Sequence, residues 1–178
     1  LVALHSTIGR EKCEVLGERL RDINPDLELN CVNRFIKDDE VDLLLDSSKF
    51  DYVVDAIDTL APKIALIKGT LDREIPLVSS MGAGGKTDPT QIEIEDISKT
   101  HHCPLARMIR ARLHKLGIEK GFSAVFSAEP VRKEAVVLCE EQNKRSNIGT
   151  LSYTPAMFGI ACASVVIRDL IGEFEYKK

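Results

Sequence analysis

The apolar positions of this chain fall into short blocks whose spacing switches repeatedly between the helical period and the strand period. In the first half, helical repeats alternate with short apolar runs of strand length. The elements predicted there are a helix from Ser6 or Thr7 to about Ile23 stopped by Asn24-Pro25, a strand at 27–32, a helix at 40–45, a strand at 52–54, a helix that begins near Pro62 and ends before Ile75, and a strand at 77–79. This alternation is typical of a parallel sheet with crossover helices.

The second half has a different pattern. Residues 91–95 alternate between polar and apolar, as a strand does, and a helical repeat from Pro104 to Leu116 ends at Gly117. The remaining predicted elements are short strands at 123–127 and 135–139, a charged loop at 140–145, a last strand, and a closing helix from Pro155. We therefore expect an α/β fold, the C-terminal part of a Rossmann-like doubly wound domain that continues into mixed or antiparallel strands and a buried C-terminal helix.

Composition favours one folded, intracellular domain. The 178 residues are 44% hydrophobic and 29% charged, which predicts a single domain over 1–178 with a sizeable core. The uncharged stretch 155–167 is shorter than the ~20 residues of a membrane span. The five cysteines form no C-x-x-C pair. This argues against a disulfide framework and a structural zinc site, and it favours a reducing, cytoplasmic compartment.

Two carboxylates follow the predicted strand at 52–54. Asp55 and Asp58 lie in a turn just past its carboxyl end, where open α/β sheets bind ligands, and Thr59 is placed to cap the next helix. The turn therefore predicts half of a nucleotide site. The simpler interpretation of Asp58 is a carboxylate that satisfies free N–H groups at a helix start. Lys63, one turn further along, is expected at the surface.

The glycine-rich turn at 82–85 invites comparison with a phosphate-binding loop. Residues 80–87 miss the pattern G-x-x-x-x-G-K-[ST] by one position, because Ser80 stands where the first glycine belongs. That loop must open directly into a helix, whereas Asp88-Pro89 and a strand pattern follow here. We therefore favour a turn whose glycines let the backbone come close to a ligand or to another strand.

Positive charge is concentrated in one stretch of a chain whose net charge is −4. Between 99 and 115 there are basic residues and no acid, and Arg107 and Arg110 are expected on the exposed side of the predicted helix. The basic residues are Lys99, Arg107, Arg110, Arg112 and Lys115. Such a face is the electrostatic footprint of nucleic-acid binding. A solvated helix face is the equally open alternative, because no aromatic residue is interleaved for stacking.

Three further features of the sequence are explained more simply by structure than by a metal-binding or catalytic role. The run 101–103, His-His-Cys, has no second ligand pair at matching spacing, and adjacent residues point in different directions, which disfavours a metal site. Cys162 is expected in the core, and Cys139 is followed by two glutamates that would raise a thiol pKa. Gly159 and Ala163 permit a close helix contact, within the fold or between subunits.

Several motifs match those of a known family. Gly9-Arg10-Glu11-Lys12, Glu18-Arg19, Ile23-Asn24-Pro25 and the stretch 51–58 resemble the adenylating enzymes related to ubiquitin-activating enzymes (ThiF/MoeB/HesA). Within this family the resemblance is to the dehydratases of threonylcarbamoyladenosine in tRNA. It rests on Ala61-Pro62-Lys63, Ile75-Pro76-Leu77-Val78, Gly82-Ala83-Gly84-Gly85, Asp88-Pro89-Thr90-Gln91-Ile92, Lys99-Thr100, Pro104-Leu105-Ala106 and Val125-Phe126-Ser127. The absence of paired C-x-x-C motifs fits this group better than the sulfur-carrier activators.

The resemblance implies an ATP-dependent cyclisation of N6-threonylcarbamoyladenosine in tRNA, after adenylation of the threonyl carboxylate. It implies that Lys12 faces the phosphates, that Asp58 is the catalytic carboxylate and meets Mg²⁺ or the leaving pyrophosphate, and that Thr59 lies in the nucleotide site. A lysine suits phosphate and a carboxylate suits Mg²⁺. The basic residues of 99–115 become candidate tRNA contacts, and a homodimer is expected. Without the resemblance, Lys12 is expected to be a solvated lysine.

The family's glycine-rich nucleotide loop and its ribose-binding acid are not found in this sequence, and Leu1 is not a methionine. We expect a segment of a larger adenylating domain, with a Rossmann-like half at 1–81 and a substrate, tRNA and dimer side at 82–178, inactive by itself. Two alternatives stay open. One is an adenylyltransferase that activates the C-terminus of a sulfur-carrier or ubiquitin-like protein, and the other is a catalytically silent interaction module.

Overall fold

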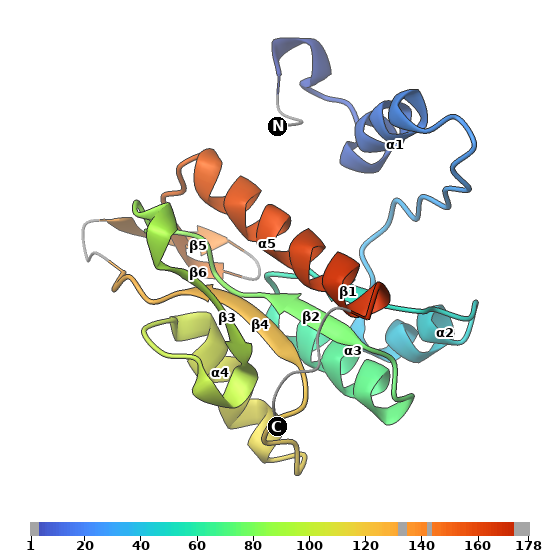
Figure 1. Cartoon of the computed structure of the whole chain (residues 1–178). Helices are drawn as coiled ribbons and strands as arrows, with labels where there is room; N and C mark the ends of the chain where they lie inside the picture. Colours follow the sequence, from blue (N-terminus) through green and yellow to red (C-terminus); the bar gives the residue numbers. More distant parts are fainter. Residues whose placement is uncertain (1–3, 132–134, 142–143, 173–178) are drawn as a thin grey trace. The chain divides into compact units, whose positions relative to one another are not determined.

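A computed structural model describes residues 4–131, 135–141 and 144–172, with the backbone alone at 136–141 and 144–147 (Figure 1). Its helices are α1 (Lys12–Ile23), α2 (Val41–Leu45), α3 (Leu60–Asp72), α4 (Pro104–His114) and α5 (Tyr153–Leu170), with short 3-10 helices at His5–Thr7, Asp38–Glu40, Pro89–Gln91 and Ile97–Lys99. Its strands are β1 (Val53–Asp55), β2 (Leu77–Ser80), β3 (Ile92–Asp96), β4 (Ser123–Ser127), β5 (Val136–Glu141) and β6 (Lys144–Ile148). The chain forms two compact units, 1–36 and 37–178, and each is described by itself.

The first unit is helical in its described part. The predicted first helix is interrupted at Gly9, whose φ of 85° leaves the helical region, so the α-helix begins only at Lys12. The strand predicted at 27–32 is wrong, because this segment has no strand pairing. A strand needs a partner to complete its backbone hydrogen bonds, and no second strand lies in the described part of this unit.

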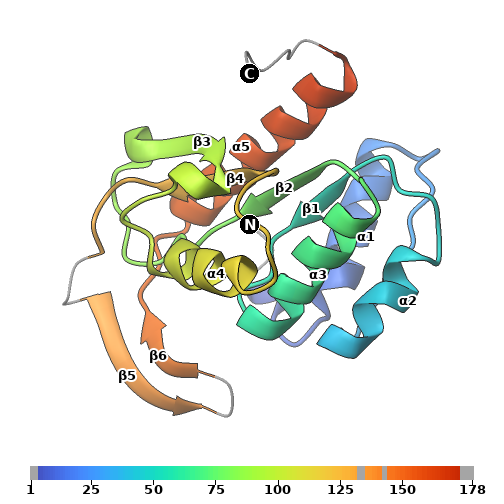
Figure 2. The same cartoon turned by 90° about the horizontal axis from the view of Figure 1, so that it is seen from below.

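The second unit is built on a four-stranded sheet in the order β1-β2-β4-β3. Strands β1, β2 and β4 are parallel, while β3 runs antiparallel to β4 with Ile92 opposite Ser127. The mixed sheet with crossover helices confirms the predicted fold class. Figure 2 shows α3 and α4 on one side of this sheet.

Two apolar clusters hold the layers together. On one face, Ile67 of α3 and Ala106, Ile109 and Leu113 of α4 pack with Leu77 and Phe126. On the other, Phe158, Cys162 and Val165 of α5 pack on Val78 and Val125. Alternate residues of β2 and β4 therefore serve opposite faces, as the strand period requires.

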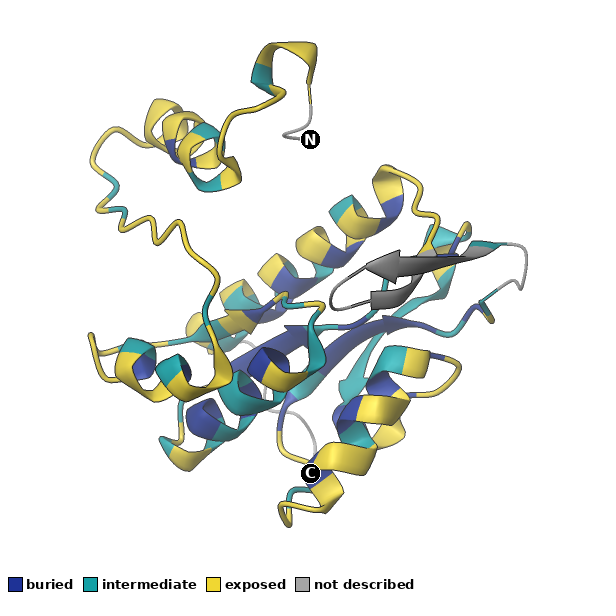
Figure 3. Cartoon of the chain, turned by 180° about the vertical axis from the view of Figure 1, so that it is seen from behind, coloured by how far each residue is buried: buried dark blue, intermediate teal, exposed yellow. Residues whose placement is uncertain are grey.

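The closing helix α5 is buried along one side only. Phe158, Cys162 and Val165 face the sheet, while Ile160 and Ile167 are exposed, so the prediction of a buried helix holds for one face (Figure 3). Strands β5 and β6 form an antiparallel hairpin ahead of this helix, and most of the predicted charged loop at 140–145 belongs to these strands. No helix of the described ranges has both the length and the apolar character that crossing a bilayer requires.

Candidate functional site

The candidate site lies at the carboxyl edge of the parallel strands. Strands β1, β2 and β4 end there at Asp55, Ser80 and Ser127, each followed by a loop. Helices α3 and α4 start near this edge, since α3 follows the loop after β1 and Gly82 approaches Leu105 of α4. The fold thus gathers the acidic turn, the glycine-rich turn and the segment 100–104 along one edge, which is where open α/β sheets bind ligands.

Asp58 is exposed in the turn between β1 and α3. Thr59 occupies the N-cap position of α3, and its side chain makes no capping bond to the helix. Its hydroxyl instead donates to Asp58 Oδ1 over 3.4 Å. The two predicted nucleotide-site residues of this turn are therefore in contact, and Asp58 presents a carboxylate at the edge of the sheet.

Asp55 and Lys63 form a buried ion pair behind that turn. Both side chains are 0% exposed, and Lys63 Nζ lies 2.6 Å from Asp55 Oδ2. The same Nζ donates to the Ser80 carbonyl oxygen over 2.9 Å, and the Ser79 hydroxyl donates to Asp55 Oδ2 over 2.6 Å. Burial lowers the pKa of the Lys63 ammonium, and the attraction of Asp55 opposes this shift. The prediction that Lys63 lies at the surface is wrong, because its side chain points inward from α3 to the carboxylate of Asp55 at the end of β1.

Lys86 cannot act as the lysine of a phosphate-binding loop. It is 1% exposed, and its Nζ donates to three carbonyl oxygens, those of Glu129, Ser127 at 3.3 Å and His102 at 3.5 Å. The glycine turn leads to a 3-10 helix and then to β3, not to an α-helix. The preference for a close-contact turn is confirmed, since a Cβ at Gly85 would lie 2.8 Å from Val131 Cγ1.

Glu129 holds the residues that follow the glycine turn. Its carboxylate accepts the N–H groups of Thr87 and Asp88 over 2.7 and 3.0 Å and the Thr87 hydroxyl over 2.8 Å. These donors, the Asp88 N–H first, hold the pKa of the Glu129 carboxyl below its ordinary value. Glu129 is not identifiable from the sequence, because a single acidic residue after a strand belongs to no motif. Its role is apparent only from its contacts in the structure.

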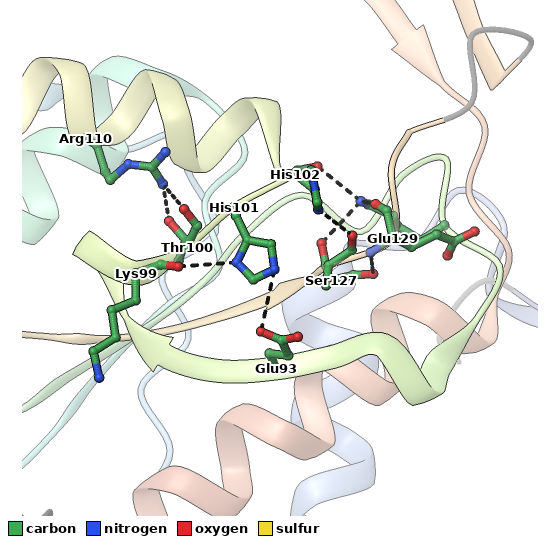
Figure 4. Close-up of polar contacts among 10 residues, drawn as sticks. Glu93, Lys99, Thr100, His101, His102, Arg110, Ser127 and Glu129 are labelled. Atoms are coloured by element: carbon green, nitrogen blue, oxygen red, sulfur yellow. Dashed lines mark hydrogen bonds and ion pairs between the residues drawn. The ribbon is translucent and has the colours of Figure 1, made fainter.

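The prediction that the side chains of the segment 101–103 point apart is wrong for its first two residues, because the His101 and His102 rings lie edge to face with their centroids 5.1 Å apart. Cys103 is buried in the core, His102 Nδ1 lies 3.0 Å from the Ala128 carbonyl oxygen, and His101 Nε2 lies 4.0 Å from Glu93 Oε2 (Figure 4). In the described ranges no cluster of three His, Cys, Asp or Glu side chains is arranged to hold a metal ion.

The basic residues of the α4 region have different surroundings. Arg107, Arg112 and Lys115 are exposed, and Lys99 Nζ lies 3.2 Å from Glu95 Oε2. Arg110 is half buried and donates to the Thr100 carbonyl and hydroxyl oxygens, so its predicted place on the exposed side is wrong. A cavity of about 320 Å³ opens beside these two arginines, Arg107 and Arg110, and its other lining residues are His102, Cys103 and Pro104.

Of the two cysteines considered in the second half of the sequence, Cys162 is the one whose side chain the structure describes. Cys162 is a core residue as predicted, and burial raises the pKa of its thiol to about 11, which leaves it protonated at neutral pH. The side chain of Cys139 lies outside the described residues.

Lys12 starts helix α1 and is exposed. It belongs to the first unit, whereas Asp58 and Thr59 belong to the second. Its predicted role toward the phosphates therefore stays a prediction.

Comparison with known proteins identifies relatives along the whole length of the chain. The model of the ThiF family matches residues 1–178. The tRNA threonylcarbamoyladenosine dehydratase of Bacillus subtilis is 39% identical over 186 aligned positions, which cover 100% of this chain and 73% of that protein. The Escherichia coli dehydratase is 35% identical, over 96% of this chain and 70% of its own length.

Solved structures of the Escherichia coli dehydratase have the same fold. Its complex with ATP superposes with a TM-score of 0.86 at 34% identity, covering 100% of this chain and 71% of that one. The complex with AMP gives a TM-score of 0.83 and covers 97% of this chain.

Proposed function

The chain belongs to the ThiF family, and from that premise we propose that it takes part in the ATP-dependent cyclisation of N6-threonylcarbamoyladenosine in tRNA. The observation that carries this proposal is the match of the whole chain to tRNA threonylcarbamoyladenosine dehydratases in both sequence and structure. The same match favours the dehydratase over an activator of a sulfur-carrier protein. A tRNA substrate and the cysteine usage of the chain also favour a cytoplasmic location.

The proposed reaction has two steps. The threonyl carboxylate attacks the α-phosphorus of ATP, which expels pyrophosphate and forms an acyl adenylate. A nitrogen of the same modified side chain then attacks the acyl carbon, AMP leaves with one carboxylate oxygen, and the nitrogen loses its proton. The product is lighter than the substrate by one water. The enzyme must hold both reactants in line and neutralise the charge that develops at phosphorus.

We assign the phosphate side of this reaction to Lys12, Asp58 and Thr59. Mg²⁺ bound to a nucleotide takes one or two protein carboxylates and completes its shell with phosphate oxygens and water. Asp58, one exposed carboxylate in the turn after β1, fits that need without a larger cluster of acids. Mg²⁺ would neutralise charge on the phosphates, while Lys12 would add a compact positive charge.

The tRNA side is assigned to the basic residues of the α4 region. Arg107, Arg112 and Lys115 are exposed cations in a stretch without acids, which suits contacts to RNA phosphates. Arg110 would act from a fixed position beside the cavity, and Lys99 would have to leave Glu95.

A homodimer is the proposed assembly. The outer face of α5 exposes Ile160, Ile167 and Leu170 beside Gly159, and a Cβ at Gly159 would meet no atom within 4 Å in the described structure. An apolar helix face that allows close backbone approach suits a self-complementary contact between two copies.

The function is tested by following AMP and pyrophosphate release by the full-length protein in the presence of ATP and Mg²⁺. We expect release that requires tRNA bearing threonylcarbamoyladenosine, is absent with unmodified tRNA, and disappears in Asp58→Ala. Release that requires a small carrier protein would support the sulfur-carrier alternative instead. No release with either substrate would leave only a binding role.

A further inference from the structure

The end of β1 and the end of β2 are joined by one buried cation. Lys63 Nζ contacts the Asp55 carboxylate at 2.6 Å and the Ser80 carbonyl at 2.9 Å. Asp55 is the last residue of β1 and Ser80 the last of β2, while Lys63 comes from the first turn of α3. Three elements that converge on the carboxyl edge are therefore held at a single point.

The other contacts of Asp55 reach the turn that carries Asp58. Asp55 Oδ1 accepts the backbone N–H of Ile57 over 3.0 Å, and Oδ2 accepts the Ser79 hydroxyl. The turn is thus fixed one residue before Asp58, and α3 holds it again through Lys63, five residues after Asp58. A buried, fully paired carboxylate of this kind leaves the backbone little freedom.

Stability alone is a weak reason to bury such a pair. Both side chains are 0% exposed, and removing two charges from water costs several kcal/mol per ion, which their attraction offsets only with good geometry. Apolar residues of similar volume are often as stabilising. At the opposite end of α3, by contrast, Arg73 forms ion pairs with Asp42 and Asp46 at the surface, where both carboxylates keep contact with water.

We propose that Asp55 and Lys63 are positioning residues that act through Asp58, setting where its carboxylate stands at the edge of the sheet. This rests on the proposed function, in which Asp58 faces the Mg²⁺ side of ATP. Neither residue touches substrate. Lys63 also holds Ser80, the last residue of β2, so the pair fixes the acidic turn and the start of the loop after β2 together.

The decisive variant is the neutral pair Asp55→Asn/Lys63→Met. Each single change leaves one charge buried without its partner and is expected to destabilise the fold. The double change removes both charges, so we expect thermal stability close to wild type. A purely structural role predicts that activity recovers with stability. The positioning role predicts that stability recovers while kcat stays about 100-fold low, with little change in the KM for tRNA.

Metal binding gives a readout that does not depend on turnover. Mn²⁺ can replace Mg²⁺ and be followed by electron paramagnetic resonance in the full-length protein with a non-hydrolysable ATP analogue. We expect the double variant to lose about 10- to 100-fold in Mn²⁺ affinity, approaching Asp58→Ala. The matched control is Arg73→Met, which breaks ion pairs at the other end of α3 and should leave Mn²⁺ affinity and kcat unchanged.

A double-mutant cycle shows whether the pair acts through Asp58 or independently of it. If the pair acts through Asp58, adding Asp55→Asn/Lys63→Met to Asp58→Ala causes no further loss, whereas independent roles give additive losses. Additive losses, a neutral pair with wild-type kcat, or an equal effect of Arg73→Met would each overturn the proposal.

Should the neutral pair fail to fold, Ser79→Ala, which removes one hydrogen bond to Asp55, is the milder variant for the same cycle. Wild-type protein without tRNA-dependent turnover would instead contradict the proposed function.

Discussion

Single side chains fix the loops at the carboxyl edge of the sheet, and Glu129 is the clearest case. It is only 6% exposed, and it ties the backbone at Thr87 and Asp88 to the end of β4. Its backbone carbonyl also accepts Lys86 Nζ, so one residue restrains three consecutive positions, 86–88, directly after the glycine turn.

The Glu129 carboxylate should make folding stability depend on acid. Its folded-state pKa lies below the ordinary value of 4.5, so its contribution is present above that value and is lost as pH falls through the lower folded pKa. Glu129→Gln should therefore destabilise the protein at pH 7, and this destabilisation should shrink as the pH falls below 4.5. Urea unfolding at pH 7 and at an acid pH measures this difference. Glu119→Gln, at an exposed carboxylate, is the control, and an equal effect at both pH values would contradict the role of charge.

Sequence reasoning placed Asp58 in the turn after the strand at 52–54 and disfavoured Lys86 as a phosphate ligand, but it misjudged Lys63, which it expected at the surface. Lys63 and Lys86 have the local pattern of a surface residue and a phosphate ligand, yet each is buried by partners that lie 8 to 43 residues away in sequence. The role of Asp55 is hidden from the sequence for the same reason. The partners that bury a charge are set by which strands become adjacent, and no local window contains that information.

At the scale of elements, a glycine is required where its backbone lies so close to another segment that a side chain would collide with it. Gly84 and Gly85 lie against Val131 and Ile148, and the Gly85 N–H donates to the Gly149 carbonyl over 2.8 Å. The glycine turn thus packs on the end of β6 and on the segments beside the β5–β6 hairpin. This packing explains why the turn is rich in glycine without the helix that a phosphate-binding loop requires.

Gly85→Ala should destabilise the protein more than Gly117→Ala. Both glycines have positive φ, 69° and 76°, so alanine costs about 1–2 kcal/mol of strain at either site. Only at Gly85 does the new Cβ also collide, with Val131 Cγ1 at 2.8 Å, whereas Gly117 has open space. Thermal unfolding of both variants measures the difference. Equal losses of stability would mean that the turn is looser than described.

Helix α4 should carry part of the affinity for tRNA. Arg107→Ala and Arg112→Ala are each expected to weaken tRNA binding and to reduce the slope of log K against log salt by about 0.7 to 0.9 for each phosphate that the variant no longer neutralises. Filter binding at several salt concentrations measures this slope. Lys68→Ala, which removes a cation paired with Asp72 on α3, is the control. Unchanged slopes for both arginine variants would assign α4 to a solvated face.

The elements themselves were largely predictable. The strand at 123–127 and the helices that became α3, α4 and α5 were predicted close to their observed bounds, because their apolar periodicity is strong. The failure at 27–32 and the hairpin in place of a charged loop share one cause. Strand pairing is a property of two segments, and the periodicity of one of them cannot specify it.

At the scale of the whole molecule, the exposed apolar face of α5 is the proposed subunit contact. Ile160 is 62% exposed on a helix whose other side packs on the sheet. Ile160→Arg should therefore shift a homodimer toward monomers at a given concentration, measured by analytical ultracentrifugation of the full-length protein. Leu43→Arg, at a 74% exposed leucine of α2, is the control and should leave the mass unchanged. A dimer that survives Ile160→Arg would place the subunit contact elsewhere.

In the proposed reaction, transfer of AMP from ATP activates the threonyl carboxylate of the modified adenosine. The most direct measurement uses tRNA whose threonyl carboxylate carries a heavy oxygen isotope, followed by mass spectrometry of both products. The proposed reaction predicts a nucleoside lighter by one water and AMP that has gained one heavy oxygen, with neither product formed by Asp58→Ala. Heavy oxygen in phosphate with ADP as the nucleotide product, or AMP without the label, would contradict it.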